Sequence, residues 1–229
     1  MSKPVLYQYR ISPFCDKVRR AMYLKGIPWD VAEVPLILTA KFKAVSPTRK
    51  FPAVDFGGEI IVDSSAILAH LDRLVPVPAL LPEDPKARAD ALILEDWADE
   101  SLYFYDIVMR SWPQNSALFL DDLLHAETGL KRSLLASLIP GMHKKLGTAQ
   151  GLGRKSQADV TAELGKLYDA LVTRLDGRDW LAGDAISIAD IAVRSMHFVI
   201  DRTIEGKRLT ETRPALAAWA ARVDRLTLA

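Results

Sequence analysis

A proline-rich stretch divides this chain of 229 residues into two parts of different character. Residues 75–85 read VPVPALLPEDP and contain four prolines. Proline lacks the backbone N–H group and has a fixed φ angle, so this stretch cannot form a continuous helix or a central strand. Strand and helix patterns alternate before it, and only helical patterns follow it. We therefore predict two domains, residues 1–75 and 86–229, joined by a linker at 76–85.

The N-terminal part alternates short β-rich runs with segments whose apolar residues recur every three to four positions. These are the patterns of strands and of amphipathic helices. Gly57-Gly58 separates two apolar runs, which predicts a hairpin. The predicted elements are strands at 4–11 and 29–34, helices at 13–25 and 38–45, a hairpin at 50–62 and a helix that starts near the capping residue Ser64. This order, βαβα followed by ββα, predicts an α/β domain.

The patterns beyond the linker are helical throughout, which predicts an all-α domain. Gly129 and Pro140 are expected to interrupt one of its helices, because both residue types disfavour helix interiors. Ser187 and Asp190 have the spacing of a capping box, in which two side chains satisfy amides at a helix start. The helices are predicted at 86–111, 116–147, 157–176, 187–204 and 214–227.

Charge and composition exclude several classes of partner. Thirty basic and 29 acidic residues leave a net charge of +1, so no excess field favours nucleic acid or an anionic membrane. No apolar stretch approaches the roughly 20 residues of a membrane-spanning helix. Residues 1–4 lack the apolar core of a signal peptide, and a single cysteine cannot form an internal disulfide, so we expect a cytoplasmic protein. The four histidines lack metal-ligand spacing, so no metal site is expected.

The stretch from Tyr9 to Arg19 marks the junction of the first strand and the first helix. Ser12 is a preferred N-cap residue, and Pro13 has the φ angle that a first helical position requires. A helix start exposes N–H groups and a partial positive charge, which stabilise an anion such as a thiolate. The same residues would also make an ordinary strand-to-helix turn, so this stretch alone leaves both interpretations open.

Four motifs together resemble the cytosolic glutathione transferase family over nearly the whole chain. The βαβ-ββα order is similar to its thioredoxin-like glutathione-binding domain, and Pro52 resembles the cis-proline before its third strand. Residues 63–67, DSSAI, are similar to its acidic-Ser-x-x-Ile motif, and residues 180–190 resemble the capping box of its helical domain. Residues 12–15, SPFC, most resemble the serine types of the family.

The resemblance implies glutathione as co-substrate and assigns residues to it. Phe51, joined to Pro52 by a cis bond, would pair with the cysteinyl backbone of glutathione as an added strand does. Asp63 would accept the γ-glutamyl ammonium, and the hydroxyl and amide of Ser64 would hold the adjoining carboxylate. Lys50 would pair with the glycine carboxylate. Asp63 and Ser64 would otherwise be a plain helix cap, and most lysines are simply solvated.

The residue that activates the glutathione sulfur is expected at Ser12. The resemblance places Ser12 where glutaredoxin-like members carry their first cysteine, and its hydroxyl would donate a hydrogen bond that favours thiolate over thiol. Cys15 occupies the second cysteine position, so it is either an inert packing thiol or a redox-sensitive one. Tyr9 is an alternate source of the hydroxyl, as in the tyrosine types.

A second substrate would lie between Ser12 and the helical domain. Apolar side chains there would suit a hydrophobic electrophile, although the same side chains would also serve as core. The candidate lining residues are Tyr103, Ile107 and Trp112, with Phe104, Val108, Met109 and Phe119 as further members. The acidic run from Glu95 to Glu100 is typical of a solvated face, and the resemblance would let Asp99 approach glutathione in the partner subunit of a homodimer.

The expected activity is transfer of glutathione to an electrophilic carbon. Reduction of peroxides or disulfides by the same thiolate would need the same binding residues. A non-catalytic binding scaffold is the third hypothesis, because the family also uses its fold in that way. The presence of Lys50, Phe51-Pro52, Asp63 and Ser64 favours the enzyme over the scaffold.

Overall fold

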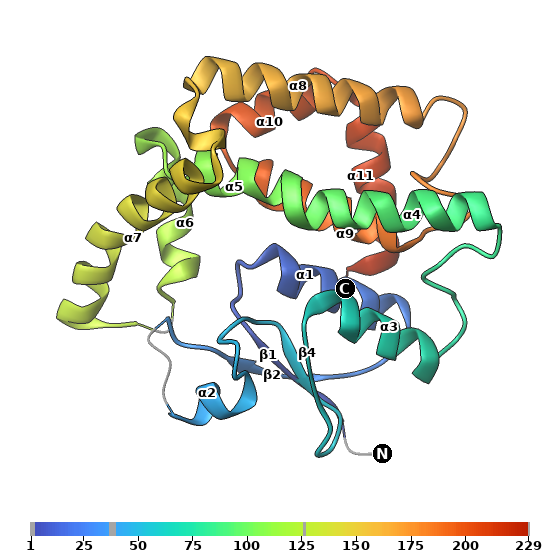
Figure 1. Cartoon of the computed structure of the whole chain (residues 1–229), viewed down its shortest axis with the longest axis horizontal. Coiled ribbons are helices and arrows are strands. Elements are labelled where there is room, and N and C mark those ends of the chain that lie inside the picture. The colour runs from blue at the N-terminus through green and yellow to red at the C-terminus, as the bar shows by residue number, and fades with distance from the viewer. Residues whose placement is uncertain (1–2, 37–39, 126, 229) are drawn as a thin grey trace.

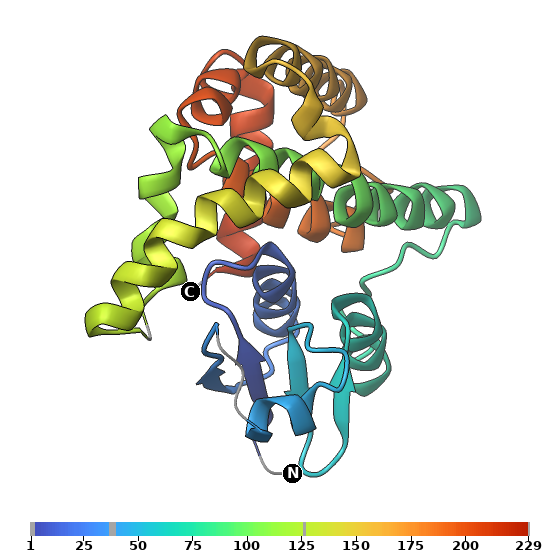
Figure 2. The ribbon, with the colours of Figure 1, turned by 60° about the vertical axis from the view of Figure 1, so that its left-hand side comes forward.

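A computed structural model describes residues 3–36, 40–125 and 127–228. The chain forms a small sheet with its helices and a larger helical part, seen from two sides in Figures 1 and 2. The N-terminal elements are β1 (Val5–Gln8), α1 (Pro13–Leu24), β2 (Asp30–Glu33), α2 (Ala40–Val45), β3 (Ala53–Asp55), β4 (Ile60–Val62) and α3 (Ser64–Leu74). This order confirms the predicted βαβα-ββα arrangement of a thioredoxin-like part.

The four strands form one mixed sheet in the order β2-β1-β3-β4. β1 is parallel to β2 and antiparallel to β3, and β3 is antiparallel to β4. The predicted hairpin turns at Gly57-Gly58, whose φ angles of 85° and 109° suit glycine and few other residues. Leu6 of β1 pairs with Val54 of β3, and both are fully buried in the main core. Helix α1 lies between the sheet and the helical part (Figure 2).

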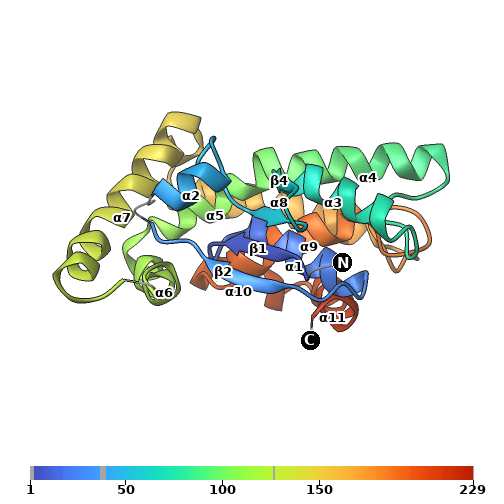
Figure 3. The ribbon, with the colours of Figure 1, turned by 90° about the horizontal axis from the view of Figure 1, so that it is seen from below.

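The regular elements among the described residues of the C-terminal part are all helices, as predicted. Its elements are α4 (Pro85–Trp97), a π-helical turn (Ala98–Leu102), α5 (Tyr103–Arg110), α6 (Pro113–Leu123), α7 (Gly129–Gln150), a 3₁₀ turn (Leu152–Arg154), α8 (Gln157–Arg174), α9 (Ile188–Ile200), α10 (Ile204–Glu211) and α11 (Pro214–Thr227). Almost every residue of α9 is buried, which marks it as the central helix. Both α1 and α4 pack against α9, and Figure 3 shows α9 beside α1 from the sheet side.

The predicted interruption at Pro140 is wrong, because α7 runs through this residue without a break. An internal proline removes one backbone hydrogen bond and crowds the preceding turn. Packing outweighs that cost here. Gly147 of α7 lies so close to α5 that a Cβ atom there would be 2.5 Å from Cγ2 of Val108. The interruption predicted at Gly129 is confirmed, since α7 begins at that residue.

Other boundaries also differ from the prediction. The first strand ends at Gln8, because residues 9–11 turn toward the start of α1. The helix predicted at 187–204 ends at Ile200, and a separate helix α10 follows. Thr203 caps α10 by accepting a hydrogen bond from the Gly206 amide at 3.0 Å. The predicted start of the short helix at residues 38–39 lies outside the described residues.

Residues 75–84 form neither helix nor strand. Their course is held by Lys25, whose Nζ donates to Asp72 Oδ1 at 2.5 Å and to the carbonyl oxygens of Val75 and Pro78 at 2.7 and 2.5 Å. Within the described ranges, no helix is long and apolar enough to cross a membrane. The division into two domains and the cytoplasmic location stay predictions.

Candidate functional site

Strand register brings three segments to one edge of the sheet. Tyr7, next to the end of β1, pairs with Ala53 at the start of β3, and Ala53 pairs with Val62 at the end of β4. The residues just beyond these positions therefore share that edge. They are the loop that leads to Ser12, the Phe51-Pro52 peptide bond, which is cis as predicted, and the pair Asp63 and Ser64.

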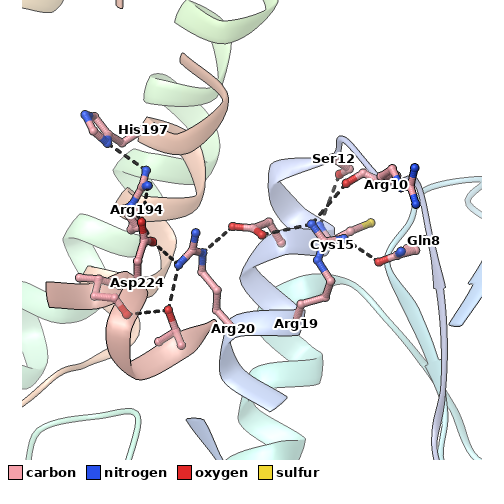
Figure 4. Close-up of polar contacts among 12 residues, drawn as sticks. Gln8, Arg10, Ser12, Cys15, Arg19, Arg20, Arg194, His197 and Asp224 are labelled. Carbon is pink, nitrogen blue, oxygen red and sulfur yellow. Dashed lines mark hydrogen bonds and ion pairs between the residues drawn. The ribbon is translucent and has the colours of Figure 1, made fainter. Parts of the chain in front are cut away.

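Ser12 starts helix α1 as the predicted N-cap (Figure 4). Its amide donates to the Tyr9 carbonyl at 3.0 Å, which closes the turn after β1. Its Oγ accepts a hydrogen bond from the Cys15 amide at 3.4 Å. A hydroxyl that accepts one hydrogen bond keeps its own proton for another. The half-buried Ser12 hydroxyl can therefore donate to a sulfur placed at the helix start.

Cys15 lies on the first turn of α1 and is fully buried. The small apolar cluster around it contains Val34, Val45, Phe51 and Ala53. Burial raises the pKa of the Cys15 thiol to about 11, and the hydrogen bond with Ser12 opposes this rise only in part. A protonated, inaccessible thiol is a weak nucleophile. The packing role is therefore favoured over the redox role.

Tyr9 and Lys50 are both neighbours of Phe51. The Tyr9 ring meets the Phe51 ring edge-on, with ring centroids 5.7 Å apart. Burial raises the pKa of the Tyr9 hydroxyl, and the nearby Cys15 adds to this effect. Tyr9 therefore has packing contacts of its own at the edge of the site. Lys50 is exposed, and its carbonyl accepts a hydrogen bond from Ser46 Oγ at 2.7 Å.

Asp63, not Ser64, is the N-cap of α3. Its Oδ1 accepts a hydrogen bond from the Ala66 amide at 3.0 Å, and Ser64 is the first residue of the helix. The prediction missed this because both residue types are good caps and the sequence does not show which one leaves the helical conformation. Asp63 has a φ angle of 89°, a region that side-chain-bearing residues seldom occupy. Strained backbone of this kind is found preferentially at functional sites.

A buried ionic group, here called the Lys17 cluster, joins four elements. They are α1, α3, α4 and the π-helical turn that follows α4. The cluster consists of Lys17, Ser65, Glu95 and Asp99. Lys17 is fully buried, and its Nζ donates to Asp99 Oδ2 at 2.7 Å, to Ser65 Oγ at 3.1 Å and to Glu95 Oε1. The Ser65 hydroxyl also donates to Glu95 Oε1. Two carboxylates thus share one buried ammonium.

The Lys17 cluster corrects the prediction of a solvated face from Glu95 to Glu100 at Glu95 and Asp99, whereas Asp96 and Glu100 are exposed as predicted. Glu95 is only 8% exposed, and Asp99 contacts Lys17 of its own chain. The signal was present in the sequence, since Glu95 falls on the stripe of buried residues that includes Ala91, Ala98 and Leu102. Lys17 and Ser65 were not among the predicted site residues.

Asp99 is the least satisfied member of the Lys17 cluster. Burial raises the pKa of its carboxyl to about 6, Lys17 opposes the rise, and the charges of Glu95 and Asp63 add to it. Among the described residues, no hydrogen-bond partner reaches its buried Oδ1. Asp99 also sits in the π-helical turn at residues 98–102, and such turns often mark functional sites. This geometry leaves an acceptor available near Asp63.

The predicted electrophile wall is assembled only in part. Phe14, two residues after Ser12, packs on Tyr103 with ring centroids 4.9 Å apart, and Tyr103 packs on Phe104 at 5.4 Å. Burial raises the pKa of the Tyr103 hydroxyl to about 12. Ile107 is buried, and Trp112 belongs to the main core. Tyr103 is therefore a predicted wall residue that contacts the first turn of α1, next to Ser12.

The capping box at the start of α9 is confirmed. Asp190 Oδ2 accepts from the Ser187 amide at 3.0 Å, while its Oδ1 accepts from the Leu181 amide and from Trp219 Nε1, both at 2.9 Å. Asp190 is fully buried, so this group has a structural role. In the part of the chain that the structure describes, no group of three or more His, Cys, Asp or Glu residues is arranged to hold a metal ion.

A thioredoxin-like sheet with a cis-proline edge and an attached helical part defines a glutathione transferase fold, and comparison with known families agrees. The family described as "Glutathione S-transferase, N-terminal domain" matches residues 6–84, and "Glutathione S-transferase, C-terminal domain" matches residues 139–226. The two matches together span more than half of the chain. The chain belongs to the cytosolic glutathione S-transferase family.

Individual members of the family are similar to parts of this chain or to its whole fold. Maleylacetoacetate isomerase of Mus musculus is 37% identical over 100 residues, which are 41% of this chain and 46% of that protein. Glutathione S-transferase Z2 of Arabidopsis thaliana is 34% identical over 132 residues, 55% of this chain and 56% of that protein. The chain thus spans about half the length of the curated relatives it matches. Rice GST1, solved in complex with glutathione, has 25% identity and a TM-score of 0.68, covering 98% of this chain and 88% of that one.

Proposed function

We propose that this protein is a glutathione transferase in which Ser12 stabilises the thiolate of bound glutathione. The observation that carries the proposal is the single sheet edge shared by Ser12, the cis Phe51-Pro52 bond and the Asp63 cap. The family membership supports glutathione as the ligand. Glutathione would lie extended along this edge, with its sulfur at the start of α1.

Each end of glutathione has a matching group on this edge. The backbone of Phe51 would pair with the cysteinyl residue in the manner of an added strand. The start of α3 at Ser64 would hold the γ-glutamyl carboxylate, and the exposed Lys50 would pair with the glycine carboxylate. The γ-glutamyl ammonium would lie between Asp63 and the unpartnered Oδ1 of Asp99.

Charge supports the ammonium site. With Asp99 ionised, Glu95 and Asp99 carry two negative charges against one positive charge on Lys17, so the formal sum of the Lys17 cluster is −1, and the exposed Asp63 adds a further negative charge nearby. An excess of buried negative charge is costly unless a cation compensates it. A ligand ammonium would supply that compensation. It would also lower the pKa of Asp99, because an opposite charge nearby favours the ionised carboxylate.

The chemistry follows from the helix start. The Ser12 hydroxyl would donate to the sulfur, and the N-terminus of α1 would add favourable electrostatics, so the bound thiol ionises more readily. The thiolate then attacks an electrophilic carbon, the new S–C bond forms, and the leaving group departs with its electron pair. Ser12 forms no covalent bond in this scheme. The apolar contact of Phe14 with Tyr103 suits a hydrophobic electrophile.

The test is a pH titration of thiolate absorbance for glutathione bound to the wild type, Ser12→Ala and Cys15→Ala. We expect the bound thiol pKa of the wild type to lie below that of free glutathione, and Ser12→Ala to raise it by about one unit, equal to about 1.4 kcal/mol. Cys15→Ala is the matched control, since its thiol is buried and protonated, and should leave this pKa unchanged. Binding without a pKa shift in the wild type would support the scaffold hypothesis instead.

A second candidate function is cis–trans isomerisation of an unsaturated acid. The mouse relative is named a maleylacetoacetate isomerase, and the exposed Arg10 lies two residues before Ser12, where it can meet a substrate carboxylate. The same thiolate would add to the double bond, allow rotation about the resulting single bond and leave again. Isomerisation therefore requires glutathione without consuming it, whereas transfer consumes one glutathione per turnover. Peroxide or disulfide reduction would instead yield oxidised glutathione, so product analysis separates the three activities.

The predicted homodimer also stays a proposal. Helix α7 presents an exposed apolar ridge at every fourth position, which suits burial against a second copy. The ridge consists of Leu130, Leu134, Leu138, Met142 and Leu146. Light scattering of the wild type and of Leu134→Glu with Leu138→Glu tests it. A dimer that is unaffected by these changes would exclude the ridge as its interface.

A further inference from the structure

A second buried polar group, here called the Arg20 network, joins α1 to α9 and to the last helix, α11 (Figure 4). Its members are Gln8, Asp16, Arg19, Arg20, Arg194, His197, Asp224 and Thr227. Arg20 is fully buried at its centre. Its Nε donates to Asp16 Oδ2 at 2.5 Å, and its Nη1 donates to Asp224 Oδ1 at 2.7 Å and to Thr227 Oγ1 at 2.8 Å.

The network continues from Asp16 to the loop that carries Ser12. Asp16 Oδ1 accepts from Arg19 Nη2 at 3.1 Å. Arg19 in turn donates through Nη1 to Gln8 Oε1 at 2.6 Å and through Nη2 to the Arg10 carbonyl at 3.3 Å. Gln8 ends β1, and the Arg10 carbonyl lies between β1 and Ser12. A continuous set of polar contacts therefore runs from α11 to the strand end and turn that precede Ser12.

The far end of the network is anchored in the helical core. Arg194 of α9 holds both oxygens of Asp224, through Nε at 3.0 Å and Nη2 at 2.7 Å. The ring of Phe198 lies under the guanidinium groups of both Arg20 and Arg194, 5.8 and 5.4 Å from its centroid. Arg194 also contacts His197 Nδ1 at 3.1 Å. Asp224 is thus held by α9 while it holds α1.

The network is stable against pH changes near neutrality. Burial, helped by the nearby cations Arg194 and Arg20, lowers the pKa of His197 to about 3. A neutral His197 can accept at Nδ1 from Arg194 and donate at Nε2 to Thr210 Oγ1, which is 2.9 Å away. Its neighbour Asp224 stays ionised, because Arg194 and Arg20 keep the pKa of its carboxyl below the ordinary value.

We propose that Asp224 is a positioning residue for the candidate active site, acting through Arg20, Asp16 and Arg19 on the turn that places Ser12. This proposal rests on the proposed function. Asp16 connects Arg20 to Ser12, because its carboxylate accepts from Arg20 and its amide donates to the Ser12 carbonyl at 2.9 Å. Ser12 acts on a sulfur through a single hydrogen bond, and a displacement of about 1 Å in a reacting group can reduce a rate about a hundredfold.

The test compares Asp224→Asn with the wild type and with Asp169→Asn. Asp169 is the matched control, since its exposed carboxylate pairs with Arg213 away from the network. Asp224→Asn is expected to lower turnover at saturating glutathione about tenfold, to change glutathione affinity less than about threefold, and to raise the bound thiol pKa. Asp169→Asn should change none of these. An unchanged bound thiol pKa in folded Asp224→Asn would overturn the proposal.

A second readout needs no glutathione. Hydrogen exchange of the Asp16 amide reports whether the first turn of α1 is held in place. Asp224→Asn should accelerate it about tenfold, and Asp169→Asn should not. If the wild type does not lower the pKa of bound glutathione, the proposed function is wrong. Unchanged exchange of the Asp16 amide in Asp224→Asn would overturn the positioning role of Asp224 independently of that result. Should Asp224→Asn not fold, Thr227→Val removes one contact of Arg20 and is expected to act in the same direction with a smaller effect.

Discussion

Helix α1 contributes residues to two buried ionic groups that differ in their charge balance. The Lys17 cluster, between α1 and the α3 and α4 elements, has one cation against two carboxylates. The Arg20 network, between α1 and the α9 and α11 elements, sets Arg19, Arg20 and Arg194 against Asp16 and Asp224. The carboxyl pKa values follow this difference, since that of Asp99 is raised to about 6 and that of Asp224 is lowered.

The difference separates a binding role from a positioning role. A buried group whose carboxylates are matched by at least as many arginines has little to gain from a further cation. A buried group with excess negative charge and an unpartnered oxygen gains from a cation. The Lys17 cluster, which lies next to Asp63, is of the second kind, and the Arg20 network is of the first kind.

The largest expected effect is that of Arg20→Ala. Removing this guanidinium takes one buried partner from Asp16 and one from Asp224, which keep only Arg19 and Arg194 respectively, and breaking buried pairs in this way costs about 3–5 kcal/mol. Urea unfolding measures the loss. Lys155→Ala removes a pair with Glu163 in which the two side chains are 46% and 36% exposed, and it should cost much less, because solvent screens exposed pairs. Equal losses in the two variants would remove the distinction between buried network and surface pair.

Asp99→Asn should stabilise the free protein at pH 7 by about 1–3 kcal/mol, according to the raised pKa of this carboxyl. The folded state retains the proton up to about pH 6, whereas an unfolded aspartate loses it near pH 4. The wild type therefore loses stability as pH rises between these values. Unfolding free energies of both proteins from pH 4 to pH 7 should be nearly equal at the acidic end and diverge toward neutrality.

Asp224→Asn should show the opposite dependence on pH. The folded-state pKa of Asp224 is lowered by Arg194 and Arg20, so its stabilising contribution is complete above about pH 4 and is lost as pH falls through the folded pKa. The deficit of the variant should therefore shrink in acid. Similar pH profiles for Asp99→Asn and Asp224→Asn would contradict the contrast between the two groups.

Asp99→Asn should weaken glutathione binding, although it is expected to stabilise the free protein. Asp99→Asn removes one negative charge near the proposed ammonium site, and we expect about fivefold to tenfold weaker binding, close to 1–1.4 kcal/mol. Calorimetric titration measures the affinity. Asp96→Asn, on an exposed position of the same helix, is the matched control. Unchanged affinity in Asp99→Asn would leave Asp99 without a role in the ammonium site.

Thr227→Val is the smallest change in the series. It removes the hydrogen bond from Arg20 Nη1 and the one that the Thr227 hydroxyl donates to the Val223 carbonyl within α11, and it keeps the side-chain volume, so the expected loss of stability is about 0.5–1.5 kcal/mol. Chemical denaturation with an unchanged m value measures it. A loss as large as that of Arg20→Ala would mean that Thr227, rather than the carboxylates, dominates the network.

Local backbone chemistry made several features predictable. The cap at Ser12 and the Ser187–Asp190 box depend on residues at most three positions apart. The predicted cap at Ser64 failed by one residue, because Asp63 is an equally good cap. The predicted break at Pro140 failed because close packing of α7 on α5 outweighed the local cost of proline.

The sequence by itself determined the order of strands and helices, the start of α1 at Ser12 and the proline at the sheet edge. These depend on hydrogen bonds, φ preferences and apolar spacing within a few residues. Only the tertiary structure decided the ionic partners. Lys17 meets Glu95 across 78 positions, and Arg20 meets Asp224 across 204. Local sequence patterns contain no information on contacts between residues so far apart in the chain, because the packing of whole helices decides which charged side chains are buried together.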